Sequence, residues 1–498
     1  MAGRDTIRFL LDGELHEVSH GDPTRTVLQY LREDLHRSGT KEGCAEGDCG
    51  ACTVVVAETD AAGTSLTVRA INSCIQFLPT LDGKELFTVE SLGGSRKLHA
   101  VQQAMVECHG SQCGFCTPGF VMSLFALYKN NAAPTRREID DALAGNLCRC
   151  TGYQPIVDAA KRMYTPDLQR SGDDWIDAAG HADKDTAADQ ARIAAIRTLK
   201  DRHSLAITDG KRTFRAPESV QECATFIEQN PDALLLAGGT DIGLWVTKQL
   251  RQPHEIIYLG NVAELKTIRE TAGEVDIGAA VTLTDAMPVI LRHYPELDEL
   301  FHRFASPPIR NAGTLGGNIA NGSPIGDTMP ALMALDATLV LRCGAKARRL
   351  PLADFYVAYQ KTALQQGEFL ERILVPTPVP GARMASYKVS KRFDQDISAV
   401  CGAFWLLLDG DRVGDVRMAY GGMAAVPKRA LNAEAALRGE RWSAKTLALA
   451  AKALEKDFAP ISDMRASASY RRQVCANLLR RFHDAGDGET QGVYRYGR

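Results

Sequence analysis

The sequence lacks any long apolar run and any imbalance of charge. No stretch approaches the roughly 18–20 apolar residues that a membrane-spanning helix needs, and the N-terminal residues Met-Ala-Gly-Arg-Asp-Thr lack the apolar core of a secretory signal. The 58 basic residues nearly balance the 61 acidic ones, which leaves a net charge of −3. This balance gives no reason to expect nucleic acid or an anionic membrane as a partner. We expect a cytoplasmic protein of about three domains.

The thirteen cysteines are unevenly distributed. Nine of them lie between Cys44 and Cys150. Without a secretory signal, such clustering favours metal ligation over disulfides, because a reducing compartment keeps thiols reduced. We interpret the four isolated cysteines as ordinary small apolar residues; they are Cys223, Cys343, Cys401 and Cys475.

The densest cysteine group has the spacing C-x4-C-x2-C at Cys44, Cys49 and Cys52, and Cys74 follows it. This spacing is typical of the plant-type ligand run for a two-iron, two-sulfur cluster. Glycines between the cysteines allow the positive φ values and the close N–H groups that a loop around a cluster needs. Four buried thiols or a zinc site are the alternatives, but zinc usually takes two C-x2-C pairs.

A second group has the uncommon pattern C-x2-C followed by C-x-C. Cys113 and Cys116 stand at the start of one predicted helix, and Cys148 and Cys150 stand after the end of another, so four thiols from two turns can converge in a helical bundle. Zinc stays open as the alternative metal that this group could bind. Cys108 has no partner at ligand spacing and is left out.

Local patterns predict a small sheet domain followed by helices. Asp12-Gly13 is a two-residue hairpin signal between strands, and Thr135 with Glu138 forms a capping-box pattern that begins a helix. Strands are expected at residues 6–11, 14–18, 53–57, 66–71 and 85–89. Helices are expected at residues 26–35, 98–108, 120–128, from 135 toward 146, and at 153–164.

Residues 165–203 have the composition of a linker, with a loose helix expected within 186–199. Beyond them, a predicted buried strand at 233–236 ends in the glycine-rich turn Gly238-Gly239, and a second glycine-rich stretch covers 311–327. Such turns let backbone N–H groups approach a phosphate, although the G-x-G-x-x-G pattern is absent and plain tight turns are the alternative. Later strands are expected near 385–389, 403–408 and 416–421, with helices from about 428 and a frayed tail from 486.

Together these features resemble the iron–sulfur/FAD small subunit of bacterial xanthine dehydrogenases, within the molybdenum hydroxylase family. The resemblance covers essentially the whole chain. It rests on the motifs at residues 43–52, 112–119, 146–153, 237–243, 313–318 and 386–396.

The resemblance implies a multidomain α+β protein. Its parts would be a β-grasp ferredoxin-like 2Fe-2S domain at 1–90, a four-helix 2Fe-2S domain at 91–164 and a linker at 165–203. A two-part FAD-binding α+β domain would follow at 204–380, then a C-terminal α+β flavoprotein domain at 381–490 and a tail at 491–498.

The resemblance also implies roles for single residues. Cys44, Cys49, Cys52 and Cys74 would bind one cluster, and Cys113, Cys116, Cys148 and Cys150 the other. Gln112 would face the molybdopterin of a partner subunit, and Phe304 would pack on the flavin ring. The remaining FAD contacts would be Leu235, Leu236, Ala237, Gly238, Gly239, Thr240, Asp241, Ile242, Gly313, Thr314, Leu315, Gly316, Gly317, Asp327, Leu370 and Lys388. No residue of this chain is expected to act as a general acid or base.

The function implied is electron transfer in purine catabolism. A separate large subunit would bind the molybdopterin and oxidise hypoxanthine or xanthine, in an (αβ)2 heterotetramer, because the sequence stops where a single-chain relative would continue. Electrons would pass through the helical-domain cluster, the ferredoxin-like cluster and FAD to NAD⁺, with O2 as the other possible acceptor.

Other functions stay open. The oxidised substrate could be an aldehyde, nicotinate or another N-heterocycle, since substrate selection would reside in the partner. The chain could also be a stand-alone reductase that oxidises NADH for a soluble acceptor. From a different class of protein, it could be a zinc-binding scaffold with a nucleotide-binding domain.

Overall fold

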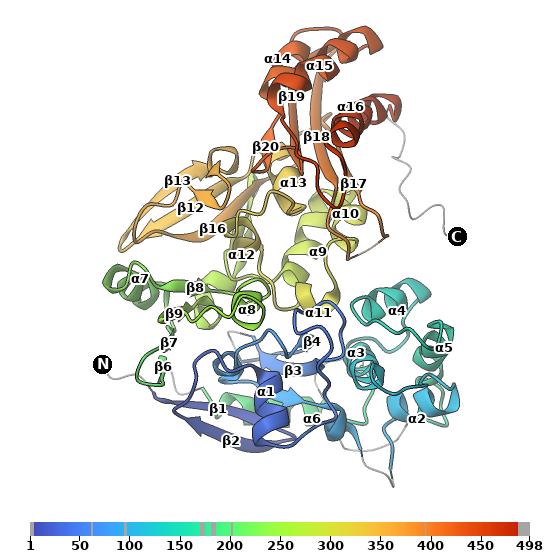
Figure 1. Cartoon of the computed structure of the whole chain (residues 1–498), viewed down its shortest axis with the longest axis vertical. Helices are drawn as coiled ribbons and strands as arrows, with labels where there is room; N and C mark the ends of the chain where they lie inside the picture. The colour runs from blue at the N-terminus through green and yellow to red at the C-terminus, as the bar shows by residue number, and fades with distance from the viewer. Residues whose placement is uncertain are drawn as a thin grey trace. The chain divides into compact units, whose positions relative to one another are not determined.

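The structure is a computed structural model, and it describes residues 4–60, 63–93, 97–169, 175–180, 186–200, 203–393 and 395–486. The chain forms two compact units (Figure 1). The first unit comprises Met1–Phe226, Asp232–Ala263 and Ser306–Gly313. The second comprises Ile227–Pro231, Glu264–Ala305 and Thr314–Arg498.

The first unit opens with a five-stranded sheet in the order β2-β1-β5-β3-β4. Its strands are β1 (Thr6–Leu11), β2 (Glu14–Ser19), β3 (Thr53–Thr59), β4 (Leu66–Asn72) and β5 (Glu85–Phe87). β1 and β5 pair in parallel, and the other pairs are antiparallel. Asp12 (φ 58°) and Gly13 (φ 81°) make the predicted turn with the positive φ values of type I′.

The helix predicted before the first cysteines is divided. Thr26 caps α1 (Val27–Gln29), and a π-helical turn follows at Tyr30–Asp34. Leu35 closes this wider turn by donating its N–H to the carbonyl of Tyr30. The regular 3.6-residue period expected over 26–35 is therefore wrong for the second half, because the backbone widens there before it enters the cysteine loop.

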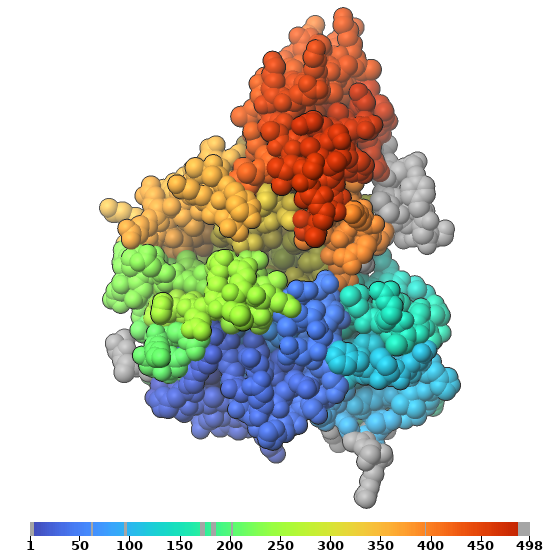
Figure 2. Space-filling model, in the orientation of Figure 1, coloured from blue at the N-terminus to red at the C-terminus, as the bar shows by residue number. Residues whose placement is uncertain are grey.

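A four-helix domain follows. Its helices are α2 (Ala100–Glu107), α3 (Thr117–Asn130), α4 (Arg136–Leu143) and α5 (Gln154–Arg162). α3 buries most of its residues and packs against β3 and β4 as well as α2 and α4, so it lies between the sheet and the other helices (Figure 1). The predicted capping box of Thr135 and Glu138 begins α4. In Figure 2 the ferredoxin-like part (blue) and the helical part (cyan to teal) lie next to each other on the visible surface.

The described parts of the predicted linker pack closely on these two domains. Trp175 is 4% exposed, stacks on Phe87 at a centroid distance of 5.4 Å and donates its indole N–H to Asp189. From α6 (Ala187–Arg197), Arg192 lies over the Trp175 ring and forms an ion pair with the buried Glu85. This segment is therefore a structural part of the iron–sulfur half of the chain.

The first unit ends in a second, four-stranded sheet with the order β6-β7-β9-β8. Its strands are β6 (Leu205–Thr208), β7 (Thr213–Ala216), β8 (Leu234–Leu236) and β9 (Glu255–Tyr258). Its helices are α8 (Ile242–Thr247), α11 (Pro307–Arg310) and the part of α7 (Val220–Gln229) up to Phe226. One apolar core continues from the first sheet into this one, through residues such as Phe9, Leu86 and Phe214.

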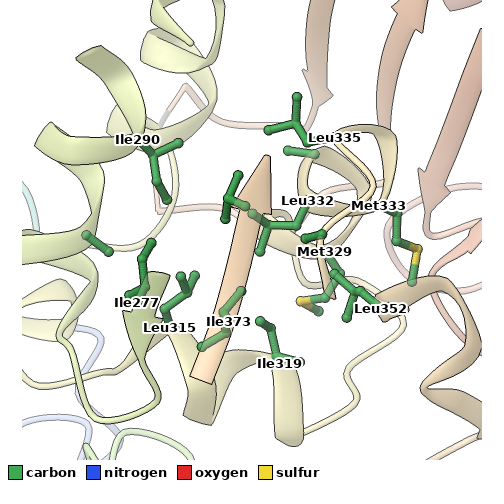
Figure 3. Packing of buried hydrophobic residues seen from close by; sticks show 14 of the residues in the cluster. Ile277, Ile290, Leu315, Ile319, Met329, Leu332, Met333, Leu335, Leu352 and Ile373 are labelled. Atoms are coloured by element: carbon green, nitrogen blue, oxygen red, sulfur yellow. The ribbon is translucent and has the colours of Figure 1, made fainter. Parts of the chain in front are cut away.

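The second unit is built around an antiparallel sheet in the order β10-β11-β16-β12-β13. Its strands are β10 (Ile268–Glu270), β11 (Glu274–Gly278), β12 (Thr338–Cys343), β13 (Lys346–Pro351) and β16 (Phe369–Pro376), with the small pair β14 (Tyr356–Ala358) and β15 (Lys361–Thr362). Its helices are α9 (Leu283–His293), α10 (Asp298–His302), α12 (Leu315–Ala320) and α13 (Thr328–Ala334). Figure 3 shows Ile277 and Ile373 of the sheet packing near Leu315, Ile319 and Leu332 of the helices.

A four-stranded antiparallel sheet and three helices complete this unit. The strands are β17 (Arg383–Val389), β18 (Val400–Asp409), β19 (Arg412–Gly421) and β20 (Lys428–Arg429), and the helices are α14 (Leu431–Leu437), α15 (Ala444–Asp457) and α16 (Ala468–Asp484). The helical region begins after β20, slightly later than predicted. The predicted multidomain α+β fold is confirmed, while most of the predicted tail lies outside the described residues. Among the described helices, none combines the length and the apolar character needed to cross a membrane.

Candidate functional site

The first cysteine loop directs backbone N–H groups at a thiol. It joins the π-helical turn to β3, and within it the Sγ atom of Cys44 accepts hydrogen bonds from the N–H groups of Glu46 and Asp48 at 3.4 Å and of Cys49 at 3.3 Å. Cys44 in turn donates its N–H to the Sγ atom of Cys49 at 3.3 Å. These donors favour a thiolate, which is the form that binds iron.

The four thiols of this region form two pairs. Cys44 shares a side-chain hydrogen bond with Cys49, and the Sγ atoms of Cys52 and Cys74 lie 3.2 Å apart. The bond with the Cys49 thiol, aided by the loop N–H groups against the effect of burial, lowers the pKa of Cys44 to about 5, while donating that bond raises the pKa of Cys49. Two adjacent thiol pairs fit a cluster in which each of two irons takes two cysteines.

Glycines are required where this loop contacts its neighbours. Gly47 (φ 77°) and Gly50 (φ 71°) have left-handed backbones. A Cβ atom at Gly50 would overlap the carbonyl oxygen of Gly145, and one at Gly43 would lie 2.7 Å from the Sγ atom of Cys49. Larger residues at these positions would push the loop away from its support.

The second cysteine group also forms two pairs. Cys116, at the N-cap of α3, shares a side-chain hydrogen bond with Cys148, and Cys113 shares one with Cys150. Burial, followed by the bond with Cys148, raises the pKa of Cys116 to about 12. Burial also acts to raise the pKa of Cys148, but hydrogen bonds from Thr151 outweigh it and lower this pKa to about 7. The four residues predicted from the spacing therefore lie as two hydrogen-bonded pairs.

The two groups differ in exposure. Cys52 and Cys74 are buried, whereas Cys113 and Cys150 are exposed, as is the neighbouring Gln112. In the part of the chain that the structure describes, no group of three or more His, Cys, Asp or Glu side chains surrounds a single ion position. Because Cys113, Cys150 and Gln112 are exposed, the second group lies at the surface of the first unit.

The glycine-rich turn after β8 packs against the start of the second glycine-rich stretch. A Cβ atom at Gly238 would overlap the carbonyl oxygen of Ala312 and approach the Cα atom of Gly313 to 2.6 Å. Gln76 donates its side-chain N–H to the carbonyl of Gly238 at 2.9 Å, and Gly239 has a φ of 73°. Within the first unit, the Gly238 turn thus packs against the first residues of the second glycine-rich stretch.

The same turn lies beside the first cysteine group. At the start of α8, a Cβ atom at Gly243 would lie 2.5 Å from the carbonyl oxygen of Ile75, the residue after Cys74. Further along α8, Thr247 donates its hydroxyl to the carbonyl of Ala45 at 2.9 Å. The segment predicted to hold the FAD pyrophosphate, Leu235–Ile242 in the sequence, therefore leads directly into a helix that contacts the cysteine loop.

The remaining predicted FAD contacts belong to the second unit. Thr314 caps α12 by accepting the N–H of Gly317 at 2.9 Å, and Leu315 and Leu370 are buried in the core. Phe304 is half-buried and packs against the same core. A Cβ atom at Gly316 would overlap the backbone of Ala279 in the same unit.

Asp327 and Lys388 form a buried ion pair with each other. Their side chains are 3% and 2% exposed. The ammonium also donates to the hydroxyl of Ser398 at 3.1 Å, and that hydroxyl donates to the other oxygen of Asp327 at 2.6 Å. The bonds to Asp327 and Ser398 use two of the three donors of the ammonium.

Sequence reasoning missed Gln76 and assigned no role to Asn146. Gln76 holds the Gly238 turn, but a glutamine two residues after a cysteine carries no recognisable signal. Asn146 opens the motif at residues 146–153, and its side-chain amide bridges the two cysteine loops. Both roles depend on contacts between segments that are distant in the sequence.

Four family models match the chain. Residues 9–75 match a 2Fe-2S iron–sulfur cluster binding domain, and residues 88–161 match a [2Fe-2S] binding domain. Residues 210–378 match the FAD binding domain in molybdopterin dehydrogenase, and residues 385–485 match the CO dehydrogenase flavoprotein C-terminal domain. Two 2Fe-2S domains and FAD-binding domains are therefore present, which decides against the zinc alternatives.

Individual relatives agree with these matches. The xanthine dehydrogenase of Emericella nidulans is 34% identical over 96% of this chain and 38% of its own length. Across the first curated relatives, this chain spans 34–40% of their length. A solved structure of carbon monoxide dehydrogenase from Hydrogenophaga pseudoflava is 31% identical, with a TM-score of 0.51 over 54% of this chain and 94% of that chain. For quinoline 2-oxidoreductase from Pseudomonas putida 86, the identity is 28% and the TM-score 0.50, over the same shares of the two chains.

Iron–sulfur and FAD-binding domains in one chain give it an electron-transfer role. The paired thiols and the packed glycine-rich turns fit these cofactors. The chain belongs to the molybdenum hydroxylase family, of which it carries the iron–sulfur and FAD-binding domains.

Proposed function

We propose that this chain is the electron-transfer subunit of a cytoplasmic xanthine dehydrogenase. A partner subunit would bind the molybdopterin and oxidise hypoxanthine or xanthine, and NAD⁺ would be the final acceptor, in an (αβ)2 assembly. The observation that carries the proposal is the 34% identity to a xanthine dehydrogenase over 96% of this chain. The proposed domain ranges are 1–90 for the ferredoxin-like domain, 91–164 for the helical iron–sulfur domain and 165–203 for the linker. The FAD-binding domain would cover 204–380 and the C-terminal flavoprotein domain 381–490.

The proposed cofactor ligands follow from the side chains described above. Cys44, Cys49, Cys52 and Cys74 would hold one cluster, and the second group of four cysteines the other. The Gly238 turn and the Gly313–Gly317 segment would hold the FAD pyrophosphate, with Asp327, Leu370, Lys388 and Phe304 as further contacts. When bound, the clusters carry single electrons and FAD exchanges one or two.

Exposure and contact support one direction of electron transfer. Cys113 and Cys150 are exposed, so the second group is accessible to a partner, and Gln112 beside it would face the molybdopterin. The first group contacts α8, which follows the Gly238 turn. Electrons would therefore enter at the second cysteine group and leave from the first toward FAD.

A direct test is to purify the native complex and analyse one sample for iron, flavin, molybdenum and xanthine-dependent reduction of NAD⁺. We expect about four irons and one flavin per chain, molybdenum on a co-purified larger subunit, and turnover with xanthine. A stable lone polypeptide that oxidises NADH would instead support the reductase alternative. Reduction of O2 but not of NAD⁺ would show that O2, and not NAD⁺, is the final electron acceptor.

One observation favours a second substrate class. The match with quinoline 2-oxidoreductase covers 94% of that protein's solved chain, at 28% identity. Another N-heterocycle could therefore take the place of xanthine at the partner subunit. The same purified complex, assayed with xanthine, quinoline, nicotinate and an aldehyde in parallel, distinguishes these substrates.

A further inference from the structure

A backbone hydrogen bond joins the two cysteine loops. Leu147, which directly precedes Cys148, donates its N–H to the carbonyl oxygen of Cys49 at 3.0 Å. Cys49 belongs to the first cysteine group and Cys148 to the second. This connection between the groups consists of a cysteine carbonyl, one hydrogen bond and one peptide unit.

A buried amide clamps this connection. Asn146 is 4% exposed, and its Nδ2 atom donates to the carbonyl of Gly50 at 3.1 Å and to the hydroxyl of Thr53 at 3.3 Å. Its Oδ1 atom accepts the hydroxyl of Ser123, on α3, at 2.6 Å. One side chain therefore ties together the first cysteine loop, β3, the second cysteine loop and α3.

Two glycines allow the loops to approach so closely. A Cβ atom at Gly119 would overlap the carbonyl oxygen of Gly50, and a Cβ atom at Gly50 would overlap that of Gly145. Both obstacles are backbone atoms, which cannot rotate away as a flexible side chain can. Gly119 follows Cys116 by one helical turn, so any displacement at Gly119 moves a ligand of the second group.

We propose that this contact sets the separation and the electronic coupling of the two clusters, with Asn146 as its positioning residue and Gly119 as the residue that permits the approach. The inference rests on the relay proposed above and extends it to the step between the clusters. Asn146 and Gly119 act by holding the carbonyl of Cys49 against the N–H of Leu147.

The test compares Asn146→Ala and Gly119→Ala with the unchanged protein, each purified natively with its partner and its cofactors. Iron content and visible absorption first establish that both clusters are bound. Two measurements follow: the magnetic splitting between the two reduced clusters by electron paramagnetic resonance, which falls with the cube of their separation, and the rate of electron exchange between them after flash photoreduction. We expect a smaller splitting and a several-fold slower exchange at full iron content.

Asn130→Ala is the matched control. Asn130 lies on α3, the helix that carries Gly119 and Ser123. It also bridges the helical domain to the sheet, because it donates to the carbonyls of Val68 on β4 and Ala126 on α3 at 2.8 and 2.7 Å. It has no contact with either cysteine group in these bonds. We expect the splitting and the rate to stay unchanged in this variant.

The inference is overturned if Asn146→Ala and Gly119→Ala keep both clusters and show the original splitting and exchange rate, or if Asn130→Ala changes them equally. If the two variants lose iron, Ser123→Ala decides, because it removes only one bond to Asn146; an unchanged splitting and rate there would also contradict the inference. Neither measurement uses purine turnover, so failure of the substrate assignment would leave this test intact.

Discussion

At the scale of single residues, the contact of Gly238 with Ala312 is the tightest feature of the candidate flavin site. The Cβ atom of an alanine would overlap a backbone carbonyl, and relieving such overpacking typically costs about 1–3 kcal/mol. We expect Gly238→Ala to lower the flavin content per chain and the unfolding temperature, as measured by absorption at the flavin bands and by thermal denaturation.

Gly273→Ala is the control for this prediction. No atom lies within 4 Å of a Cβ at Gly273, and its φ lies outside the left-handed region. We expect flavin content and unfolding temperature to match those of the unchanged protein. Full flavin binding by Gly238→Ala would contradict a role of this turn in holding FAD.

A second prediction at this scale concerns pH. Arg471 is 2% exposed and pairs with Asp463 at 2.7 Å. Burial acts to raise the pKa of Asp463, but the N–H groups of Ala466 and Arg465 and the Arg471 guanidinium outweigh it and lower this pKa to about 2. A carboxyl with a lowered pKa in the folded state stabilises the fold above its unfolded pKa, about 3.9, and loses this effect as the pH falls through the folded value.

The unfolding temperature of the native chain should therefore fall more steeply between about pH 5 and pH 2 than that of Asp463→Asn, which cannot ionise. At neutral pH the variant should unfold at a lower temperature, because the buried guanidinium of Arg471 loses its charged partner. Parallel curves for the two proteins over this range would show that the pair contributes nothing to the acid response.

At the residue scale, local spacing alone was enough to single out the cysteines. The eight that C-x4-C-x2-C and C-x2-C…C-x-C indicate form four hydrogen-bonded pairs, and their binding of two clusters stays a prediction. Asp327 and Lys388 were predicted as FAD contacts, but their pairing with each other could not be anticipated. They are far apart in the sequence, and only the tertiary fold brings an acid and a base into one buried site.

At the scale of elements, Trp175 anchors the segment between the helical domain and the flavin region. It stacks on Phe87, and Lys129 donates to its carbonyl. Removing such a buried ring typically costs about 3–5 kcal/mol. We expect Trp175→Ala to speed hydrogen–deuterium exchange in α3 and β5 of the full chain, as followed by mass spectrometry of their peptides.

Val106→Ala serves as the control in the same domain, since Val106 on α2 is 60% exposed. Its effect on stability should stay within about 0.5 kcal/mol. Faster exchange confined to residues 175–180 in Trp175→Ala would mean that the segment does not brace α3 and β5.

Elements with complete local signals were predicted well. The Asp12-Gly13 turn and the capping box at Thr135 contain all the atoms that define them, so the sequence suffices. The π-helical turn at Tyr30–Asp34 and the packing of Trp175 were not predicted. Both depend on what the segment contacts in the fold, and a composition rich in Ala, Asp and Lys hides a single anchoring ring.

At the scale of the whole molecule, the order of the redox groups makes a prediction. Cys148→Ser removes a ligand from the second group, on the partner side of the proposed relay. We expect purine-dependent reduction of NAD⁺ to be abolished, while NADH oxidation by artificial dyes through FAD stays largely intact. Loss of both activities with FAD still bound, measured on the same preparation, would contradict the proposed order.

The division into two units could not be predicted from local patterns. Residues Ser306–Gly313 return to the first unit, where Asn311 donates to the carbonyl of Ala70 at 2.9 Å. Domain order along the chain suggested a simple succession of parts. This short segment packs against a strand more than two hundred positions earlier in the sequence. No periodicity or composition of the segment indicates that contact.

The packing of Trp175 and Arg192 around Phe87 and Glu85 also bears on how the chain is made. Domains that emerge from the ribosome usually fold in succession from the N-terminus. Here β5 obtains its stacking ring and its ion-pair partner only after residue 192 has been synthesised. The iron–sulfur half therefore completes these contacts only after translation has passed beyond both sets of cysteines, so a cluster inserted before residue 192 is made would enter a partly folded chain.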